Sequence, residues 1–334
     1  MRSVLFIGSF LSKHQGTTGI SEVTALSLRE MGYDIRMCSS IKNKFARMFH
    51  IAFLVLFGKY QVVHIDVFSG SSFKIVQVAS YIAKKRGKRV FLNLRGGMLP
   101  TFFLANQNAF EKVLSRADKI ISPSKYLQQE FNKLGVAVEH LPNSVDLALF
   151  SFHAHLKNNY SLLWVRAFSP IYCPEIVIEV FRRVKDQFPE ASLTMIGPDK
   201  GKRTEIEELI SKHQLTDSVH LVGPVPHDKL PDFYHSHSVF LNTTIYESFG
   251  NCVIEAAACG IPIVSNQVGE LPFMWQNEES IMFVENNDIN QYIQAILDIW
   301  RNEAHAQHLR LNARKVAESF DRNTILQSWI RIFG

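Results

Sequence analysis

Two glutamates, Glu247 and Glu255, are the residues of this 334-residue chain whose type and spacing best suit chemistry. They flank the start of an apolar run that ends at Gly260. The run predicts a helix from about Gly250, because a glycine such as Gly260 readily adopts the left-handed conformation that closes a helix. The first amides of a helix carry partial positive charge and can hold a phosphate. We therefore predict an anion site at the start of this helix, made by Ser248, Phe249, Gly250 and Asn251.

Glu255 would lie about one turn into that helix, among valine, isoleucine and alanine. A carboxylate in apolar surroundings needs hydrogen-bond partners or a solvated face. A ribose diol is a suitable partner, because both hydroxyls can donate to one carboxylate. Glu247, on the loop before the helix, would then reach a group beyond the phosphates. The alternative is that both glutamates are ordinary surface carboxylates.

The residues of this site must be positioned by strands, since short β-branched runs alternate with helix-length segments along the chain. Such alternation is typical of parallel sheets covered on both faces. Twelve runs exceed one comfortable sheet, so we predict an α/β fold with two doubly wound, Rossmann-like domains. The predicted strands are 3–8, 34–38, 61–67, 89–94, 119–122, 138–141, 161–166, 191–197, 218–222, 238–242, 261–265 and 281–284.

The domain boundary is predicted in the polar segment Ser151–Asn159. This gives an N-terminal domain of residues 1–155 and a C-terminal domain of residues 156–334, which includes the helices expected after Asn287. Ligands of open α/β sheets bind at the carboxyl ends of the strands. We therefore expect the substrate between two facing sheets, in a central cleft.

The segment from Glu247 through Glu255 to Val264 resembles the signature of the family 4, or group 1, glycosyltransferases, which are retaining enzymes of the GT-B fold. Further likeness along nearly the whole chain lies in residues 141–146, 221–223 and 268–272. The resemblance implies that Glu255 binds the ribose of a nucleotide-sugar. It implies that Glu247 is the carboxylate at the donor sugar and its phosphate, where the reaction occurs.

The family also carries an arginine and a lysine after the first strand of the second domain, where they neutralise the donor diphosphate. This chain has Arg166, one position early, and no lysine before Lys185. A cation there would stabilise the negative charge that grows on the leaving diphosphate. We expect Arg166 to act with Tyr172 as a neutral donor, or with a basic residue from elsewhere. The alternatives are an ordinary surface arginine and a chain that has lost activity.

Three residues of the first domain are further candidates for substrate binding. Gly16 and Gly19 form a G-x-x-G loop that resembles the family's glycine loop at the donor diphosphate, although an ordinary turn has the same pattern. Arg95 follows a predicted strand where many family members have a histidine near the donor sugar. It is a candidate for binding the acceptor or a phosphate.

Charge is distributed unevenly along the chain. Residues 1–155 contain 20 Lys and Arg against 9 Asp and Glu, whereas the remainder contains 16 against 22. The segment 42–60 begins with basic residues and continues as an apolar run, so it is either a buried covering helix or a helix at a membrane interface. With the basic cluster at 84–89, it favours a lipid-linked acceptor at an anionic membrane. No nucleic-acid-binding motif is visible.

Other functional classes lack their motifs. The chain has no Asp-x-Asp pair and no third ligand for its histidine pairs, so we expect no metal, and the nucleotide-sugar is a substrate rather than a cofactor. No G-x-G-x-x-G, which a nicotinamide-dependent oxidoreductase would need, follows the first strand. The four cysteines show no paired spacing and no apolar run reaches membrane-spanning length. We expect a cytoplasmic protein that associates peripherally with the inner face of the membrane.

The sequence thus predicts a retaining, metal-independent hexosyl- or N-acetylhexosaminyl-transferase. It would use a UDP-sugar in preference to a GDP-sugar, and a glycan or lipid-linked glycan acceptor in cell-surface polysaccharide synthesis. Two alternatives stay open: a non-catalytic nucleotide-sugar-binding subunit and a nucleotide-sugar epimerase of the same fold.

Overall fold

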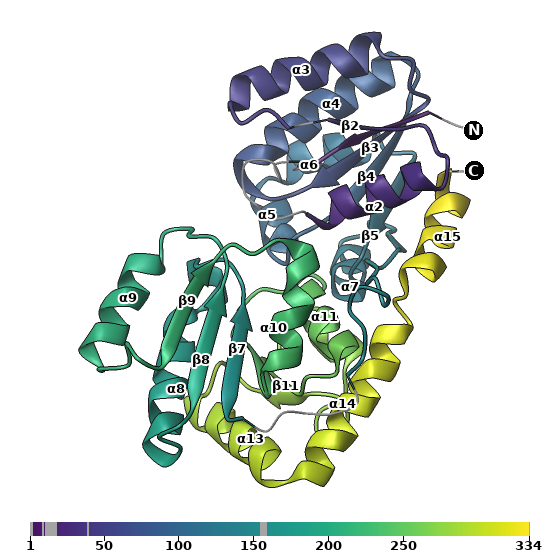
Figure 1. Ribbon diagram of the computed structural model, residues 1–334. Coiled ribbons are helices and arrows are strands. Elements are labelled where there is room, and N and C mark those ends of the chain that lie inside the picture. Colours follow the sequence, from purple (N-terminus) through teal and green to yellow (C-terminus); the bar gives the residue numbers. More distant parts are fainter. Residues whose placement is uncertain (1–2, 9, 11–18, 39, 154–158, 334) are drawn as a thin grey trace. The chain divides into compact units, whose positions relative to one another are not determined.

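The computed structural model describes residues 3–8, 10, 19–38, 40–153 and 159–333 (Figure 1). The chain divides into an N-terminal unit, residues 1–144 with 322–334, and a C-terminal unit, residues 145–321. In the described part of each unit, six parallel strands form one sheet. The predicted two-domain α/β fold is confirmed.

The sheet of the N-terminal unit has the strand order β2-β1-β3-β4-β5-β6. The direction in which successive strands are added reverses between β1 and β3. These two strands pair in parallel, and Val4 lies beside Val62. The strands are β1 (Val4–Ile7), β2 (Ile35–Cys38), β3 (Val62–Val67), β4 (Arg89–Leu94), β5 (Lys119–Ser122) and β6 (Glu139–His140).

Alternate residues of these strands pack under helices on opposite faces. Val4 and Phe6 join a core with α2 and α15, whereas Leu5 and Ile7 join a second core with α3 and α4. This two-sided burial explains why β1 is a continuous apolar run. The helices of this unit are α2 (Ile20–Glu30), α3 (Lys44–Phe57), α4 (Phe73–Lys85), α5 (Leu99–Ala105), α6 (Gln107–Leu114), α7 (Lys125–Lys133) and α15 (Arg322–Phe333).

The sheet of the C-terminal unit has the order β12-β11-β10-β7-β8-β9 and reverses between β7 and β10. Leu162 and Trp164 face a core with α8 and α13, and Leu163 faces a core with α10, α11 and α14. The strands are β7 (Ser161–Val165), β8 (Ser192–Ile196), β9 (Val219–Gly223), β10 (Val239–Asn242), β11 (Ile263–Asn266) and β12 (Met282–Val284). The helices are α8 (Pro174–Gln187), α9 (Arg203–Lys212), α10 (Leu230–Ser236), α11 (Asn251–Cys259), α12 (Leu271–Met274), α13 (Ile289–Arg301) and α14 (Glu303–Glu318).

The predicted domain boundary was placed too late in the chain. Phe150 is fully buried in the core of the C-terminal unit, and Arg310 donates to the carbonyl of His153. The segment predicted as a linker therefore begins inside this unit, and the division falls between Ser144 and Val145. Residues 154–158 of that segment lie outside the described residues.

The last helix was also assigned to the wrong domain. Helix α15 packs its apolar face, including Trp329 and Phe333, against Phe6 and Phe91 of the first sheet. An amphipathic pattern predicts a helix but does not say which core it covers. The C-terminal dozen residues therefore complete the N-terminal unit.

Candidate active site

The carboxyl ends of β7 and β10 meet where the strand order of the second sheet reverses. Ligands of open α/β sheets bind at such a switch point, because the loops on the two sides diverge there. Arg166 directly follows β7, Asn242 ends β10, and the next loop carries Glu247. The topology therefore brings together three polar side chains that are far apart in the sequence.

Arg166 and Glu247 form an ion pair with a distance of 2.5 Å between Nη2 and Oε2. The exposed fractions of the two side chains are only 12% and 10%. Burial lowers the pKa of the Arg166 guanidinium, but neighbouring negative groups, Glu247 among them, outweigh burial and raise this pKa. Arg166 is therefore a permanent cation held close to a carboxylate.

Two neighbours fix the orientation of the Arg166 guanidinium. The Asn242 side-chain oxygen accepts hydrogen bonds from Nε (3.2 Å) and Nη2 (3.0 Å). The guanidinium carbon lies 5.2 Å from the centre of the Tyr172 ring, a cation–π distance. Tyr172 thus lies beside Arg166, and its role as a neutral donor stays a prediction. Burial raises the pKa of its hydroxyl, which keeps its proton at neutral pH.

Glu247 is held by backbone contacts from two sides. Its Oε1 accepts from the Phe249 amide at 3.2 Å, and its carbonyl accepts from the Glu270 amide at 3.2 Å. Between the strand β11 and helix α12, Gly269 lies so close that an added Cβ would be 1.8 Å from the Glu247 carbonyl oxygen. The loop between β11 and α12 therefore positions Glu247, and only a glycine at 269 allows this approach.

Helix α11 begins directly after these residues, as predicted. Gly250 is its N-cap residue with φ 90°, and Gly260 closes it with φ 80°. Ser248 is partly exposed, whereas Phe249 is buried and packs edge-on against Phe320. The first amides of a helix have no acceptor within the helix. The start of α11 therefore presents partial positive charge beside the Arg166–Glu247 pair.

Glu255 has partners in the protein itself. Its Oε1 lies 2.8 Å from Nε2 of His227, and its Oε2 accepts from the Tyr234 hydroxyl at 3.3 Å. Burial lowers the pKa of His227, but the bond and charge of Glu255 outweigh burial and raise this pKa above its usual value. The site thus contains a second carboxylate, one turn into α11, whose exposed fraction is 13%.

Cys252 lies in the first turn of α11, close to these charged groups. Burial raises the pKa of its thiol to about 12. The sulfur therefore carries its proton at neutral pH and cannot act as a thiolate nucleophile.

The candidates in the N-terminal unit lie around a different polar cluster. Arg95 follows β4 and is 7% exposed; its Nε lies 3.0 Å from Asp66 Oδ1, and its Nη2 donates to Asn143 at 3.2 Å. Asp66 also accepts from Ser21 and Asn93. Burial raises the pKa of Asp66, but Arg95 and the other partners lower it further than burial raises it. Arg95 therefore has internal partners for its guanidinium.

The predicted glycine loop is described only in part. Gly19 is exposed and is the N-cap residue of α2, with φ −75°. Gly16 lies outside the described residues.

Sequence reasoning missed Asn242, His227 and Tyr234. Asn242 is the last residue of a predicted strand, so its position at the switch point was the available signal. His227 and Tyr234 lie 28 and 21 residues before Glu255, and no local pattern connects them with it.

Among the residues that the structure describes, no group of three or more histidine, cysteine, aspartate or glutamate side chains is arranged to hold a metal ion. None of the described helices is long and apolar enough to cross a membrane.

A known family matches the part of the chain that contains this site. The model of the family described as glycosyl transferases, group 1, matches residues 148–316, just over half of the chain. The matched residues include Arg166, Glu247 and Glu255.

Curated relatives are matched over part of their own length. One subunit of the phosphatidylinositol N-acetylglucosaminyltransferase of Arabidopsis thaliana is 30% identical over 135 residues, which is 40% of this chain and 30% of that protein. D-inositol 3-phosphate glycosyltransferase from Salinispora arenicola is 23% identical over 251 residues, which is 67% of this chain and 56% of that protein. The chain therefore spans about a third to a half of these relatives.

Solved structures match the whole chain. Sucrose-phosphate synthase from Thermosynechococcus elongatus has a TM-score of 0.81 at 18% identity and covers 100% of this chain and 98% of its own. Anabaena HepE in complex with UDP-glucose has a TM-score of 0.77 at 16% identity, with coverage of 100% and 99%. At this identity the likeness establishes the fold.

Proposed function

The chain belongs to the group 1 glycosyltransferases and has their GT-B fold, and we propose that it is a retaining enzyme that uses a UDP-sugar donor. The acceptor is a glycan or a lipid-linked glycan, and the product enters cell-surface polysaccharide. The buried Arg166–Glu247 pair beside the start of α11 carries this proposal, because it combines a fixed cation, helix amides and a carboxylate at the switch point of one sheet.

In the proposed mechanism, the diphosphate lies against Arg166 and the first amides of α11. When the bond between the sugar and the diphosphate breaks, negative charge grows on the leaving UDP. A guanidinium held in place by Asn242 stabilises this charge without reorganisation. Beside Arg166, the helix amides would thus take the place of the lysine that the family usually has, in a reaction that uses no metal.

Glu247 would accept hydrogen bonds from hydroxyls of the donor sugar through the carboxylate oxygens that Arg166 and the Phe249 amide hold in place. This fixes the sugar ring relative to the leaving phosphate. The acceptor oxygen then bonds to the anomeric carbon on the face from which UDP leaves, and a phosphate oxygen of UDP takes the acceptor's proton, so the anomeric configuration is retained. No side chain is proposed as a covalent nucleophile. Glu255 would accept hydrogen bonds from the ribose diol once its Oε1 no longer contacts His227.

The donor class is supported by the neighbours that share the fold. HepE of Anabaena was solved in complex with UDP and with UDP-glucose. The Arabidopsis relative is named an N-acetylglucosaminyltransferase. We therefore propose a hexosyl or N-acetylhexosaminyl group as the sugar that is transferred.

The test is the release of UDP from a panel of UDP- and GDP-sugars in the presence of glycan acceptors. The wild type is compared with Glu247→Gln and with Glu179→Gln, which breaks ion pairs with Arg182 and Arg183 on α8, outside the site. We expect Glu247→Gln to lower kcat by about a hundredfold or more, and Glu179→Gln to leave it unchanged. NMR of the product measures whether the anomeric configuration is retained; an inverted product would refute the retaining mechanism.

One observation favours a second candidate, a non-catalytic nucleotide-sugar-binding subunit. No lysine stands between Arg166 and Lys185, and Lys185 donates to the carbonyls of Pro189 and Ala191 at the end of α8. UDP binding without turnover of any donor would support this candidate. Interconversion of a UDP-sugar without an acceptor would instead indicate an epimerase.

A further inference from the structure

Helix α3 exposes a continuous row of phenylalanines. The exposed fractions of Phe45, Phe49, Phe53 and Phe57 are 73%, 77%, 59% and 65%. Their spacing of four places them on one helix face, over a length of about 18 Å. Leu56, which is 37% exposed, extends the same face. We call these five residues the α3 stripe.

The opposite face of α3 anchors the helix to its unit. Ile51, Leu54 and Val55 are buried in the core that α4 and the first sheet share. Asn43 caps the first turn by accepting from the Phe45 and Ala46 amides at 3.0 Å. The stripe therefore sits on a fixed, capped helix and is not the result of a loosely packed end. A contiguous exposed apolar face of this kind marks an interaction site.

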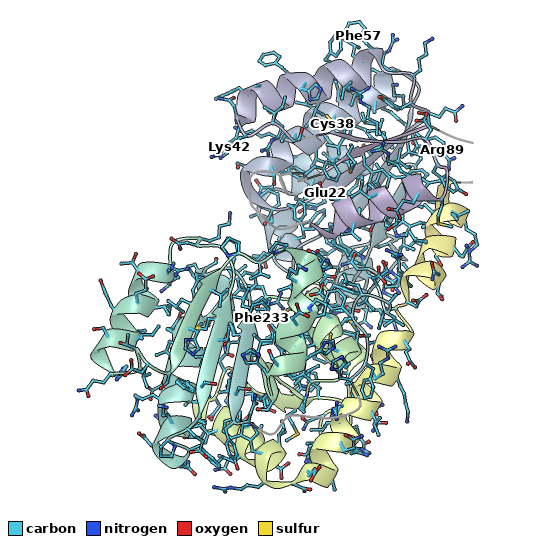
Figure 2. All side chains as sticks on the ribbon, in the orientation of Figure 1. Glu22, Cys38, Lys42, Phe57, Arg89 and Phe233 are labelled. Carbon is cyan, nitrogen blue, oxygen red and sulfur yellow. The ribbon has the colours of Figure 1, made fainter. Side chains whose placement is uncertain are left out.

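The ends of the stripe are basic. Lys42 and Lys44 precede it and Lys59 follows it, and Figure 2 shows Lys42 near one end of α3 and Phe57 near the other. Beyond Lys59 lies a cavity of about 530 Å³, also lined by Arg86, Lys88 and Arg89. Lys88 links this cavity to the helix, because its ammonium donates to the carbonyls of Gly58 and Tyr60.

Acidic residues are almost absent from this part of the chain. Residues 35–110 contain twelve Lys and Arg but a single acid, Asp66. That carboxylate is 6% exposed and lies against Arg95. In the basic cluster at 84–89, Lys84 forms an ion pair with Asp118, which lies outside residues 35–110. The exposed basic residues of this segment include Lys42, Lys44, Lys59, Lys85 and Arg86, and this excess of positive charge selects an anionic partner.

We propose that α3 docks the N-terminal unit on an anionic lipid bilayer. The helix lies parallel to the membrane surface, and the phenyl rings of the stripe enter the boundary between headgroups and acyl chains. The basic residues at both ends, and the cavity beside Arg86, bind lipid phosphates. This proposal is independent of the donor chemistry, because it uses no residue of the candidate active site.

The charge pattern argues against a second copy of the chain as the partner. Two α3 helices packed through their stripes, parallel or antiparallel, would place Lys42 and Lys44 against the same lysines or against Lys59 and Arg86. Either arrangement brings like charges together, which opposes association. A lipid surface offers negative charge to both ends.

The experiment is sedimentation of the full chain with vesicles of phosphatidylcholine alone and of phosphatidylcholine with phosphatidylglycerol in equal parts. We expect binding to the anionic vesicles only. The variant Phe49→Ser/Phe53→Ser should bind about tenfold or more weakly, because it removes two inserted rings. The matched control Leu104→Ser/Leu311→Ser removes two side chains that are 61% and 43% exposed elsewhere and should bind as the wild type. Unchanged melting temperatures show that both variants are folded.

Charge is tested by Lys59→Gln/Arg86→Gln, which should weaken binding to anionic vesicles and reduce its sensitivity to salt. Three results would overturn the proposal: equal binding to neutral vesicles, no binding to either vesicle, or stripe and control variants that bind alike. Analytical ultracentrifugation without lipid distinguishes the rival partner. A dimer that Phe49→Ser/Phe53→Ser dissociates would assign the stripe to a second copy.

Discussion

At the scale of single residues, removing one member of the Arg166–Glu247 pair leaves the other charge with little water around it. We expect Arg166→Met to lower the free energy of unfolding by about 3–5 kcal/mol, because Glu247 then has no cation. The double variant Arg166→Met/Glu247→Leu should recover most of this stability but no activity. Urea unfolding measures the stability of the single and the double variant. A single variant as stable as the wild type would show that the pair is solvated rather than buried.

The pair of His227 and Glu255 gives a pH dependence. The folded-state pKa of His227 lies above its usual value of about 6.5. The pair therefore contributes fully to the free energy of unfolding below the usual pKa of histidine. This contribution is lost as pH rises through the raised pKa of the folded state. We expect His227→Gln to lower the free energy of unfolding by about 1 kcal/mol near pH 6 and by almost nothing near pH 9. Thermal melts at the two pH values measure this. A cost that grows with pH would contradict the assignment.

A site residue could be predicted only where the sequence around it forms a recognisable pattern. Glu247, Glu255 and the start of α11 lie in one continuous segment between a strand and a glycine, so their neighbourhood was predictable. His227 reaches Glu255 from a short turn before α10. A single histidine in a loop carries no spacing that identifies its partner.

At the scale of elements, the loop between β11 and α12 decides where Glu247 lies. We expect Gly269→Ala to lower kcat about tenfold or more with a smaller effect on donor affinity, since the new Cβ would collide with the Glu247 carbonyl. Gly32→Ala is the matched control, because Gly32 also has positive φ but has nothing within 4 Å of an added Cβ. Steady-state kinetics with both variants measures the difference. Equal losses would show that backbone strain alone is responsible.

The strands were predictable because both faces of each sheet are covered. A strand such as β1, with all four residues buried, is an uninterrupted apolar run with few alternatives. Helix α3 was harder, because a buried covering helix and a membrane-facing helix have similar composition. Its inner face is buried, as the covering-helix interpretation predicts, and its outer face carries the exposed phenylalanines from which the membrane proposal is argued.

At the scale of the whole molecule, the C-terminal helix belongs to the first unit although the chain reaches it last. We expect Trp329→Ala to cost about 3–5 kcal/mol in the N-terminal unit, because Trp329 packs on Phe6 and Phe333. Hydrogen exchange should then increase in β1 and β3 and stay unchanged in β7 and β8. Faster exchange in the second sheet would contradict the assignment of α15.

The return of the chain to its first unit could not be predicted from the sequence. The apolar face of α15 would suit either core, and only the contacts with Val4 and Phe91 of the first sheet decide between them. The domain boundary could not be predicted either. Polar residues follow Phe150, and nothing in this local sequence indicates that Phe150 is buried in the core of the C-terminal unit.

The central claim is that the C-terminal unit binds a uridine nucleotide through Glu255 and Arg166. Calorimetric titration of UDP, and of GDP for comparison, into the wild type, Glu255→Gln and Glu279→Gln tests it most directly. Glu279 also lies 2.8 Å from a histidine nitrogen, of His308, but on the exposed surface. We predict that Glu255→Gln weakens UDP binding about tenfold or more, about 1.4 kcal/mol, while Glu279→Gln has no effect. Equal affinity of all three proteins, or tighter binding of GDP than UDP, would contradict the account.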